Sequence, residues 1–199
     1  MNMAQVHAAG ENQADHHGSK HTGNMPSGRL VYVSHRDEQN DYGRKLTIFQ
    51  CADKIKVVSH YQFYGDIPVI RAWTEVVNGQ DEPLCLEYVA SFALTGLEKE
   101  GLLPWQDKMQ IAIPHNTWAY EAQWQRYTLP ELGLYPKNEF SLKRIAYSST
   151  GSWPTSEYLP MGYLENTQCG TSLLWQIEAN ASWSWEISDL AGHLYLQLS

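Results

Sequence analysis

The side chains best suited to chemistry in this sequence are three imidazoles and one ammonium close to its start. The segment HHGSKH contains His16, His17, Lys20 and His21. A neutral imidazole both donates and accepts a hydrogen bond, and an ammonium donates three, so this set suits the recognition of hydroxyl groups. Metal ligands need fixed geometry and supporting partners, which a Gly-flanked segment does not supply. We therefore predict a ligand-facing loop here, and no metal site.

A second candidate lies in the run IPVIRAWTEVV, residues 67–77. In a strand, successive side chains point to opposite faces, so Arg71, Trp73 and Glu75 share one face. Aromatic rings stack on the C–H face of a sugar while charged groups bind its hydroxyls, which makes this face a candidate carbohydrate-binding surface. The alternative is a solvated face on which Arg71 pairs with Glu75 and stacks on Trp73. The sequence leaves both interpretations open.

A third candidate is the stretch STGSWPTSEYLPMGYLEN, residues 149–166, which contains two prolines. Loops longer than about 12 residues in a compact domain are usually functional. We predict that this stretch is irregular and that its semi-rigid backbone presents Trp153 for binding. The alternative interpretation is that its aromatic residues belong to a Trp-rich core.

No catalytic constellation is evident. Hydrolysis of a glycosidic bond needs two carboxylates that flank it, and the acidic residues are scattered without a pairing by spacing. Nucleophile-elbow, phosphate-loop and dinucleotide motifs are missing, so we predict no cofactor. Cys51, Cys85 and Cys169 are far apart in sequence and are predicted to be reduced residues that pack in the interior.

Short runs rich in Val, Ile and aromatic residues dominate the chain from Arg29 onward, separated by turn material such as NDYG at residues 40–43. No apolar stripe with helical spacing persists for three turns, although residues 125–135 accommodate one helical turn. We predict an all-β antiparallel sandwich or barrel at residues 29–199, after a polar tail or loop at residues 1–28. The predicted strands are residues 29–35, 45–50, 54–65, 67–77, 83–96, 108–113, 117–129, 140–148, 171–179, 182–188 and 193–199.

Charge limits the possible partners. The net charge is −8 and Lys and Arg form no cluster, which argues against binding to nucleic acid or to an anionic membrane surface. The sequence has no apolar run long enough to cross a bilayer. The first residues lack a basic region followed by an apolar one, so we expect a cytoplasmic location.

Several motifs together resemble the N-terminal domain of family 36 glycoside hydrolases, the bacterial α-galactosidases or melibiases. They are HHGSKHTG, HYQFYGDIPVIRAWTEVVN, LEYVASFALTG, SSTGSWPTSEYLPMGYLEN and WQIEANASWSWEI, and the resemblance runs from about Asp15 to Ser199. One departure is Ala181, where the family has Gly. The resemblance implies an antiparallel β-supersandwich similar to galactose mutarotase.

In that family the domain packs on a following (β/α)8 barrel, which carries an Asp nucleophile and an Asp acid/base. Such a barrel needs about 250 residues, so this chain does not contain it. The resemblance implies an accessory domain that packs on the barrel, helps to form a homo-oligomer and extends its early loop toward an α-galactoside. We expect the Trp- and Tyr-bearing strands at residues 175–195 to expose the apolar patch that meets the barrel.

Two other functions remain open. The first is a free-standing carbohydrate-binding module that uses Arg71, Trp73 and Glu75, or Trp153, as its platform. The second is a mutarotase-like epimerase with acid–base catalysis by His60, His115 and Glu178.

Overall fold

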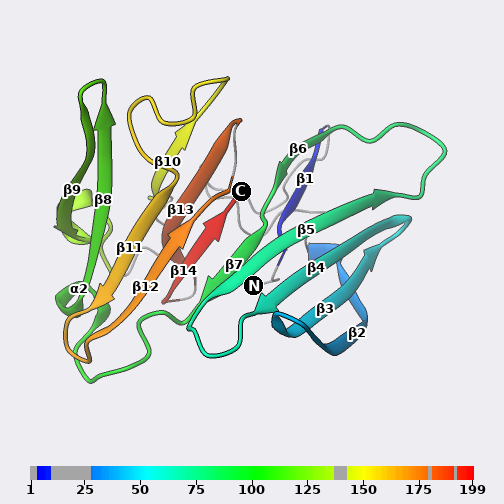
Figure 1. Cartoon of the computed structure of the whole chain (residues 1–199), viewed down its shortest axis with the longest axis horizontal. Helices are drawn as coiled ribbons and strands as arrows, with labels where there is room; N and C mark the ends of the chain where they lie inside the picture. Colours follow the sequence, from blue (N-terminus) through cyan, green and yellow to red (C-terminus); the bar gives the residue numbers. More distant parts are fainter. Residues whose placement is uncertain (1–3, 10–27, 137–142, 179–180, 191) are drawn as a thin grey trace. The chain divides into compact units, whose positions relative to one another are not determined.

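The computed structural model describes residues 4–9, 28–136, 143–178, 181–190 and 192–199, and the regular secondary structure of these residues is almost entirely antiparallel β-strand (Figure 1). They divide into two compact units. Unit 1 comprises the described residues up to Ala93, and unit 2 those from Leu94 onward. The predicted all-β class is confirmed. In the described residues, an observed strand overlaps every predicted one.

Unit 1 is built on a four-stranded antiparallel meander, with a separate two-stranded sheet of β1 and β6. The first hairpin forms at residues 40–43, as predicted, because the Asn40 side chain accepts hydrogen bonds from the backbone N–H groups of Tyr42 and Gly43 at 3.0 and 3.1 Å. The strands of unit 1 are β1 (Val6–Ala8), β2 (Val31–Asn40), β3 (Gly43–Ala52), β4 (Ile55–Phe63), β5 (Ile70–Asn78) and β6 (Leu86–Val89).

The core of unit 1 lies against one face of the meander. Ile55 and Val57 alternate along β4 and are buried with Val6, Leu30 and Ala52. Val6 belongs to β1, a strand inside the segment that we predicted to be a tail. Three residues are too few for an alternating pattern to be recognised, so the sequence gives no signal for this strand.

Unit 2 contains two four-stranded sheets, with the strand orders β10-β13-β14-β7 and β12-β11-β8-β9. A 3-10 turn, η1, ends at Gly133, whose φ is 80°, and confirms the expected helical turn. The elements are β7 (Phe92–Thr95), α2 (Trp105–Lys108), β8 (Met109–Thr117), β9 (Tyr120–Thr128), η1 (Pro130–Leu132), β10 (Ile145–Ser149), β11 (Met161–Asn166), β12 (Thr171–Gln176), β13 (Trp183–Leu190) and β14 (His193–Leu198).

Buried aromatic rings join the two sheets of unit 2. Trp175 of β12 meets Trp185 of β13 edge-on, with ring centroids 5.2 Å apart, and Tyr147 of β10 lies 5.0 Å from Trp185. Trp183 and Tyr195 are buried as well. The expectation that the strands at residues 175–195 expose an apolar patch is therefore wrong for the four of these rings within that range, since all four are buried.

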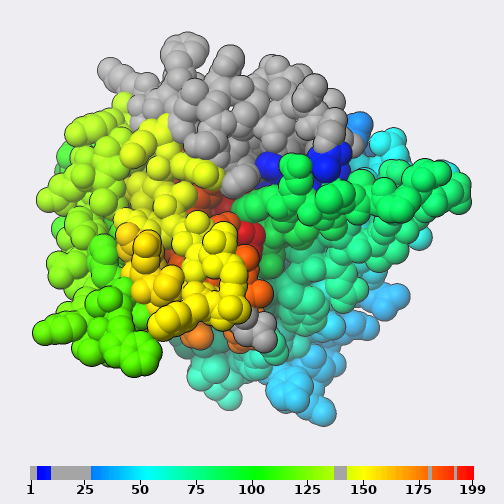
Figure 2. All heavy atoms as spheres, turned by 90° about the horizontal axis from the view of Figure 1, so that it is seen from above, coloured from blue at the N-terminus to red at the C-terminus, as the bar shows by residue number. Residues whose placement is uncertain are grey.

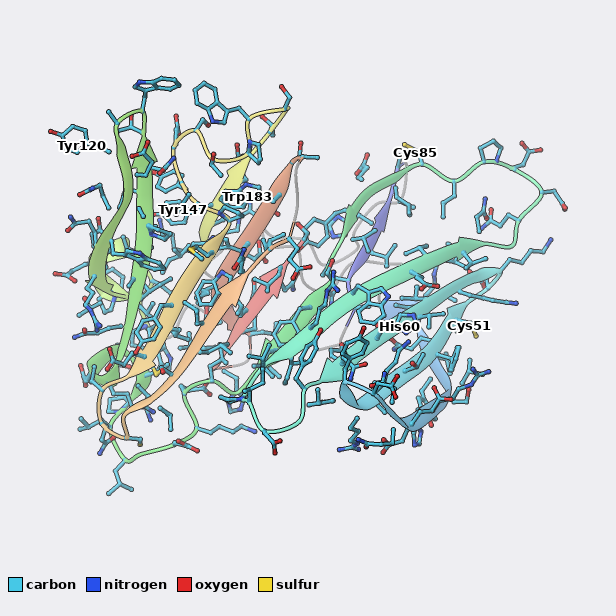
Figure 3. The ribbon with its side chains drawn as sticks, in the orientation of Figure 1. Cys51, His60, Cys85, Tyr120, Tyr147 and Trp183 are labelled. Atoms are coloured by element: carbon cyan, nitrogen blue, oxygen red, sulfur yellow. The ribbon has the colours of Figure 1, made fainter. Side chains whose placement is uncertain are left out.

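Two further expectations need correction. Residues 149–166 are not irregular throughout, because Met161–Asn166 form β11, which pairs with both β8 and β12. The cysteines of the described residues are free, but Cys85 and Cys169 are exposed and only Cys51 is half-buried, so two of the three do not pack in the interior. Figure 3 shows the Cys51 and Cys85 side chains beside the strands of unit 1.

Candidate functional site

The first candidate is the histidine-rich segment. His16, His17, Lys20 and His21 lie outside the described residues. Their role in binding hydroxyl groups therefore stays a prediction.

The second candidate occupies the face of the unit 1 meander opposite the core. Register pairs Gln62 with Arg71 and His60 with Trp73, so Arg71 and Trp73 share a face as alternation predicts. Arg71 is exposed and Trp73 is half-buried. The strand β5 thus presents the expected residues, and the neighbouring strands β3 and β4 add groups that the sequence alone did not associate with them.

These groups form a cluster around the Trp73 indole. The His60 imidazole stacks on it with ring centroids 4.7 Å apart and planes 13° from parallel. Lys45 Nζ lies 5.1 Å from the indole centroid. His60 Nε2 lies 3.1 Å from Glu75 Oε1, and its Nδ1 lies 3.3 Å from Thr47 Oγ1. Part of the indole surface is therefore covered by protein, and Glu75 contacts His60. Sugar binding by Arg71 and Trp73 stays a prediction.

Burial controls the protonation of this cluster. His60 is only 9% exposed, and loss of hydration lowers its pKa below the ordinary value of 6.5. The charge of Glu75 opposes this shift, while the charge of Lys45 adds to it. Burial of the imidazole between Thr47 and Glu75 thus favours its neutral form.

The third candidate, Trp153, belongs to unit 2 and is 57% exposed. It meets Trp118, which is 81% exposed, edge-to-face at a centroid distance of 6.1 Å and an interplanar angle of 84°. Trp118 stands in the turn between β8 and β9, near Tyr120, which Figure 3 labels at the end of that hairpin. Trp153 belongs to the segment that precedes β11, and Figure 2 shows this segment, in yellow, at the molecular surface.

The sequence does not mark Trp118 as a turn residue, because its turn contains no Gly, Asn, Asp or Pro. The two residues that connect Thr117 to Tyr120 are Trp118 and Ala119, and Ala119 has a φ of 65°. Asn and Gly are the residues that favour this left-handed conformation, so the run TWAYEAQWQRYTL resembled one continuous strand. The tertiary structure divides it between β8 and β9.

The residues proposed for an epimerase belong to different units. His60 lies in unit 1, while His115 and Glu178 lie in unit 2. His115 Nε2 lies 3.1 Å from the Tyr127 hydroxyl. The centroids of the His115 and Tyr158 rings are 5.3 Å apart. His115 is thus surrounded by aromatic side chains, which is consistent with a packing role.

Two buried carboxylates of unit 2, those of Glu186 and Glu98, have structural partners. Glu186 accepts a hydrogen bond from Arg144 at 2.6 Å and another from the Tyr195 hydroxyl at 2.9 Å. Glu98 Oε1 lies 2.7 Å from His193 Nδ1, and its Oε2 accepts the Leu194 N–H. These oxygens stabilise the sheet that contains β13 and β14, and they leave little capacity for acid–base chemistry.

Among the residues that the structure describes, no three His, Cys, Asp or Glu side chains are grouped so that they could hold a metal ion. In the same part of the chain, no helix has the length and apolar character that crossing a membrane requires.

The geometry is that of a β-sandwich protein with exposed aromatic side chains, in which the buried Glu98 and Glu186 carboxylates contact neighbouring polar groups. Neither the protein-family models nor the curated protein sequences contain a match to this chain. Among solved structures, the chain is similar in fold to the galactosidase domain of alpha-galactosidase-sucrose kinase, AgaSK, with a TM-score of 0.67 and 16% sequence identity. The similarity covers 85% of this chain and 24% of that one.

AgaSK is a family 36 enzyme, so the fold that the motifs implied is confirmed. The chain spans about a quarter of the matched protein.

Proposed function

We propose that this chain is the N-terminal accessory domain of an α-galactosidase-like glycoside hydrolase, whose parent activity is hydrolysis of terminal α-galactosides. The observation that carries the proposal is the fold similarity to a galactosidase domain, which extends over most of this chain but only a quarter of the matched one. The motif resemblance to family 36 supports the same role.

The domain would act by packing on a (β/α)8 catalytic barrel, by shaping its substrate site and by helping to form a homo-oligomer. The occupied carboxylates support a non-catalytic role. Glu186 is bound by Arg144 and Tyr195, and Glu98 by His193, so neither is available to flank a scissile bond. Catalysis would come from the barrel, and this domain would contribute binding and positioning.

Two proteins test the proposal: this chain of 199 residues alone, and the same chain extended along its own reading frame. We expect no turnover of p-nitrophenyl α-galactoside by the chain alone and clear turnover by the extended protein. Light scattering of the extended protein would report its oligomeric state. Turnover by the purified chain alone, or a reading frame that does not continue into a barrel, would contradict the proposal.

A second function, a free-standing carbohydrate-binding module, is favoured by one observation, the exposed pair of Trp118 and Trp153. The two functions differ in what the chain does without a barrel. A carbohydrate-binding module has the same affinity for its carbohydrate with or without a barrel. An accessory domain binds more tightly when the barrel is present. The ratio of affinities of the chain and of the extended protein for the same oligosaccharide discriminates between them.

A further inference from the structure

The pair of exposed indoles in unit 2 calls for a physical explanation. Trp105, Trp175, Trp183 and Trp185 are buried in the described structure, as is usual for this residue type, whereas Trp118 and Trp153 are 81% and 57% exposed. These two rings come from segments more than thirty positions apart in sequence, yet they contact each other at 84°. Two exposed indoles in this edge-to-face arrangement leave apolar ring surface in contact with solvent.

The segment that carries Trp153 is firmly attached to the hairpin that carries Trp118. The Asn116 N–H donates to the Glu157 carbonyl at 2.7 Å, and the Leu159 N–H donates to the Pro114 carbonyl at 3.1 Å. The Asn116 side chain also donates to the Thr155 carbonyl. The backbones that carry the two indoles are therefore held together, which reduces the ordering needed when a ligand binds.

The backbone beside the indoles adopts an uncommon conformation. Ala119 and Ala122 have φ values of 65° and 54°, a left-handed region that costs a residue with a Cβ about 1 kcal/mol or more. The Asn116 side chain accepts the Ala122 N–H at 3.1 Å and so helps to hold this conformation. The tight turn of the β8–β9 hairpin thus holds Trp118 at an exposed position beside Trp153.

We propose that Trp118 and Trp153 form a platform that binds a pyranose ring of a carbohydrate. An indole face accepts the C–H face of a sugar, and the second ring, perpendicular to the first, limits its position. The same two segments carry exposed residues with hydroxyl and carboxylate groups of the kind that bind sugar hydroxyls: Thr117, Ser152, Ser156 and Glu157. This inference rests on the proposed function only in the choice of an α-galactoside as the probe.

Other occupants fit the observations less well. The two indoles and the nearby exposed Tyr120 together cover less than the roughly 800 Å² per partner that a stable protein interface buries. Nucleic acid is disfavoured by the net charge of −8. A quaternary ammonium ion needs a desolvated aromatic cage, and at sites as open as Trp118 its attraction to a ring contributes only about 0.5–1 kcal/mol.

The test uses the whole chain and four variants: Trp118→Ala, Trp153→Ala, Trp118→Phe and, as a matched control, Trp124→Ala. Trp124 is also exposed and lies on β9 of the same hairpin. Affinity electrophoresis in gels that contain galactomannan, whose side groups are α-galactosyl units, measures binding, and circular dichroism checks the fold. Melibiose and choline serve as soluble competitors.

We expect galactomannan to retard the wild-type chain, and melibiose to reverse the retardation. Trp118→Ala and Trp153→Ala should each weaken binding by about fivefold or more, since each removes the stacking of an aromatic ring on a ligand ring. Trp118→Phe should retain part of the binding and Trp124→Ala most of it. All variants should keep the wild-type circular dichroism spectrum.

Three results would overturn the inference: a wild-type chain that galactomannan does not retard, equal binding by wild type and both alanine variants, or competition by choline but not by melibiose. Self-association that Trp118→Ala abolishes would assign the pair to a contact between copies of the chain and would overturn it too. None of these results bears on whether the chain acts with a barrel, so the platform and the proposed function fail separately.

Discussion

At the scale of single residues, His60 shows how a side chain acquires a role that its position in the sequence does not suggest. It stands in the motif HYQFYG, between residues that alternate toward the core. Pairing of β4 with β5 places it opposite Trp73, and the two rings stack. Glu75, which we considered as a partner of Arg71, lies 3.1 Å from His60 Nε2. The cluster is therefore a cross-strand structure that packs and rigidifies this face.

The depressed pKa of His60 makes stability depend on pH. Between its lowered folded pKa and the ordinary value of 6.5, the unfolded chain binds more protons than the folded protein. The free energy of unfolding should therefore decrease as pH falls through 6.5 and level off below the folded pKa. His60→Gln removes this contribution, so the stability advantage of the wild type over the variant should shrink with decreasing pH.

Urea unfolding of both proteins across this range, followed by tryptophan fluorescence, measures the effect. The matched control is His35→Gln, since His35 is exposed on β2. Curves for wild type and His60→Gln that run parallel from above pH 6.5 to well below it would contradict the prediction.

A glycine inside β11 is required by the ring opposite it. A Cβ on Gly162 would lie 2.2 Å from Cζ2 of Trp175, its cross-strand partner in β12. Because Trp175 is buried, its ring has little room to move, and Gly162→Ala should destabilise the protein by about 1–3 kcal/mol. Thermal or urea unfolding measures the loss. Gly65→Ala is the control, since nothing lies within 4 Å of a Cβ there, and an equal loss in both variants would exclude the steric explanation.

At the scale of elements, β13 shows what alternation predicts correctly and what it misses. Trp183, Trp185 and Ile187 share one buried face, as the period of two predicts. The opposite face is also buried, because Glu186 is only 2% exposed and Ser188 is fully covered. The polar groups on that face are satisfied by neighbouring segments. Ser188 Oγ donates to the Lys143 carbonyl at 2.6 Å, and Glu186 binds Arg144 and Tyr195.

The buried ion pair of β13 should therefore be sensitive to substitution. Glu186→Gln leaves the Arg144 guanidinium without its carboxylate in a partly buried site, which should cost about 3 kcal/mol in the free energy of unfolding. The matched control is Glu165→Gln, which removes the ion pair with the more exposed Arg126 and should cost less than about 1 kcal/mol. Equal losses in the two variants would contradict the assignment of Glu186 as the structural carboxylate.

At the scale of the whole molecule, the described residues form two compact units, and the boundary between them follows Ala93. The expectation of one domain at residues 29–199 after a polar tail or loop stays a prediction. The composition around Ala93 changes too little to mark a boundary. The strand β7 (Phe92–Thr95) runs across it, and its residues FALT resemble those of every other strand. A boundary inside a strand has no linker signal, because the signals of a linker are Pro, Gly and polar residues.

The sequence by itself determined the all-β class, the hairpin at residues 40–43 and the shared face of Arg71 and Trp73. Each of these depends on local properties, namely side-chain alternation, β-branched and aromatic content, and turn residues. Only the tertiary structure decided that Trp118 meets Trp153, that Glu75 meets His60, and that Gly162 belongs to a strand. These contacts join segments distant in the chain or adjacent strands, and their formation depends on which strands pair and in which register.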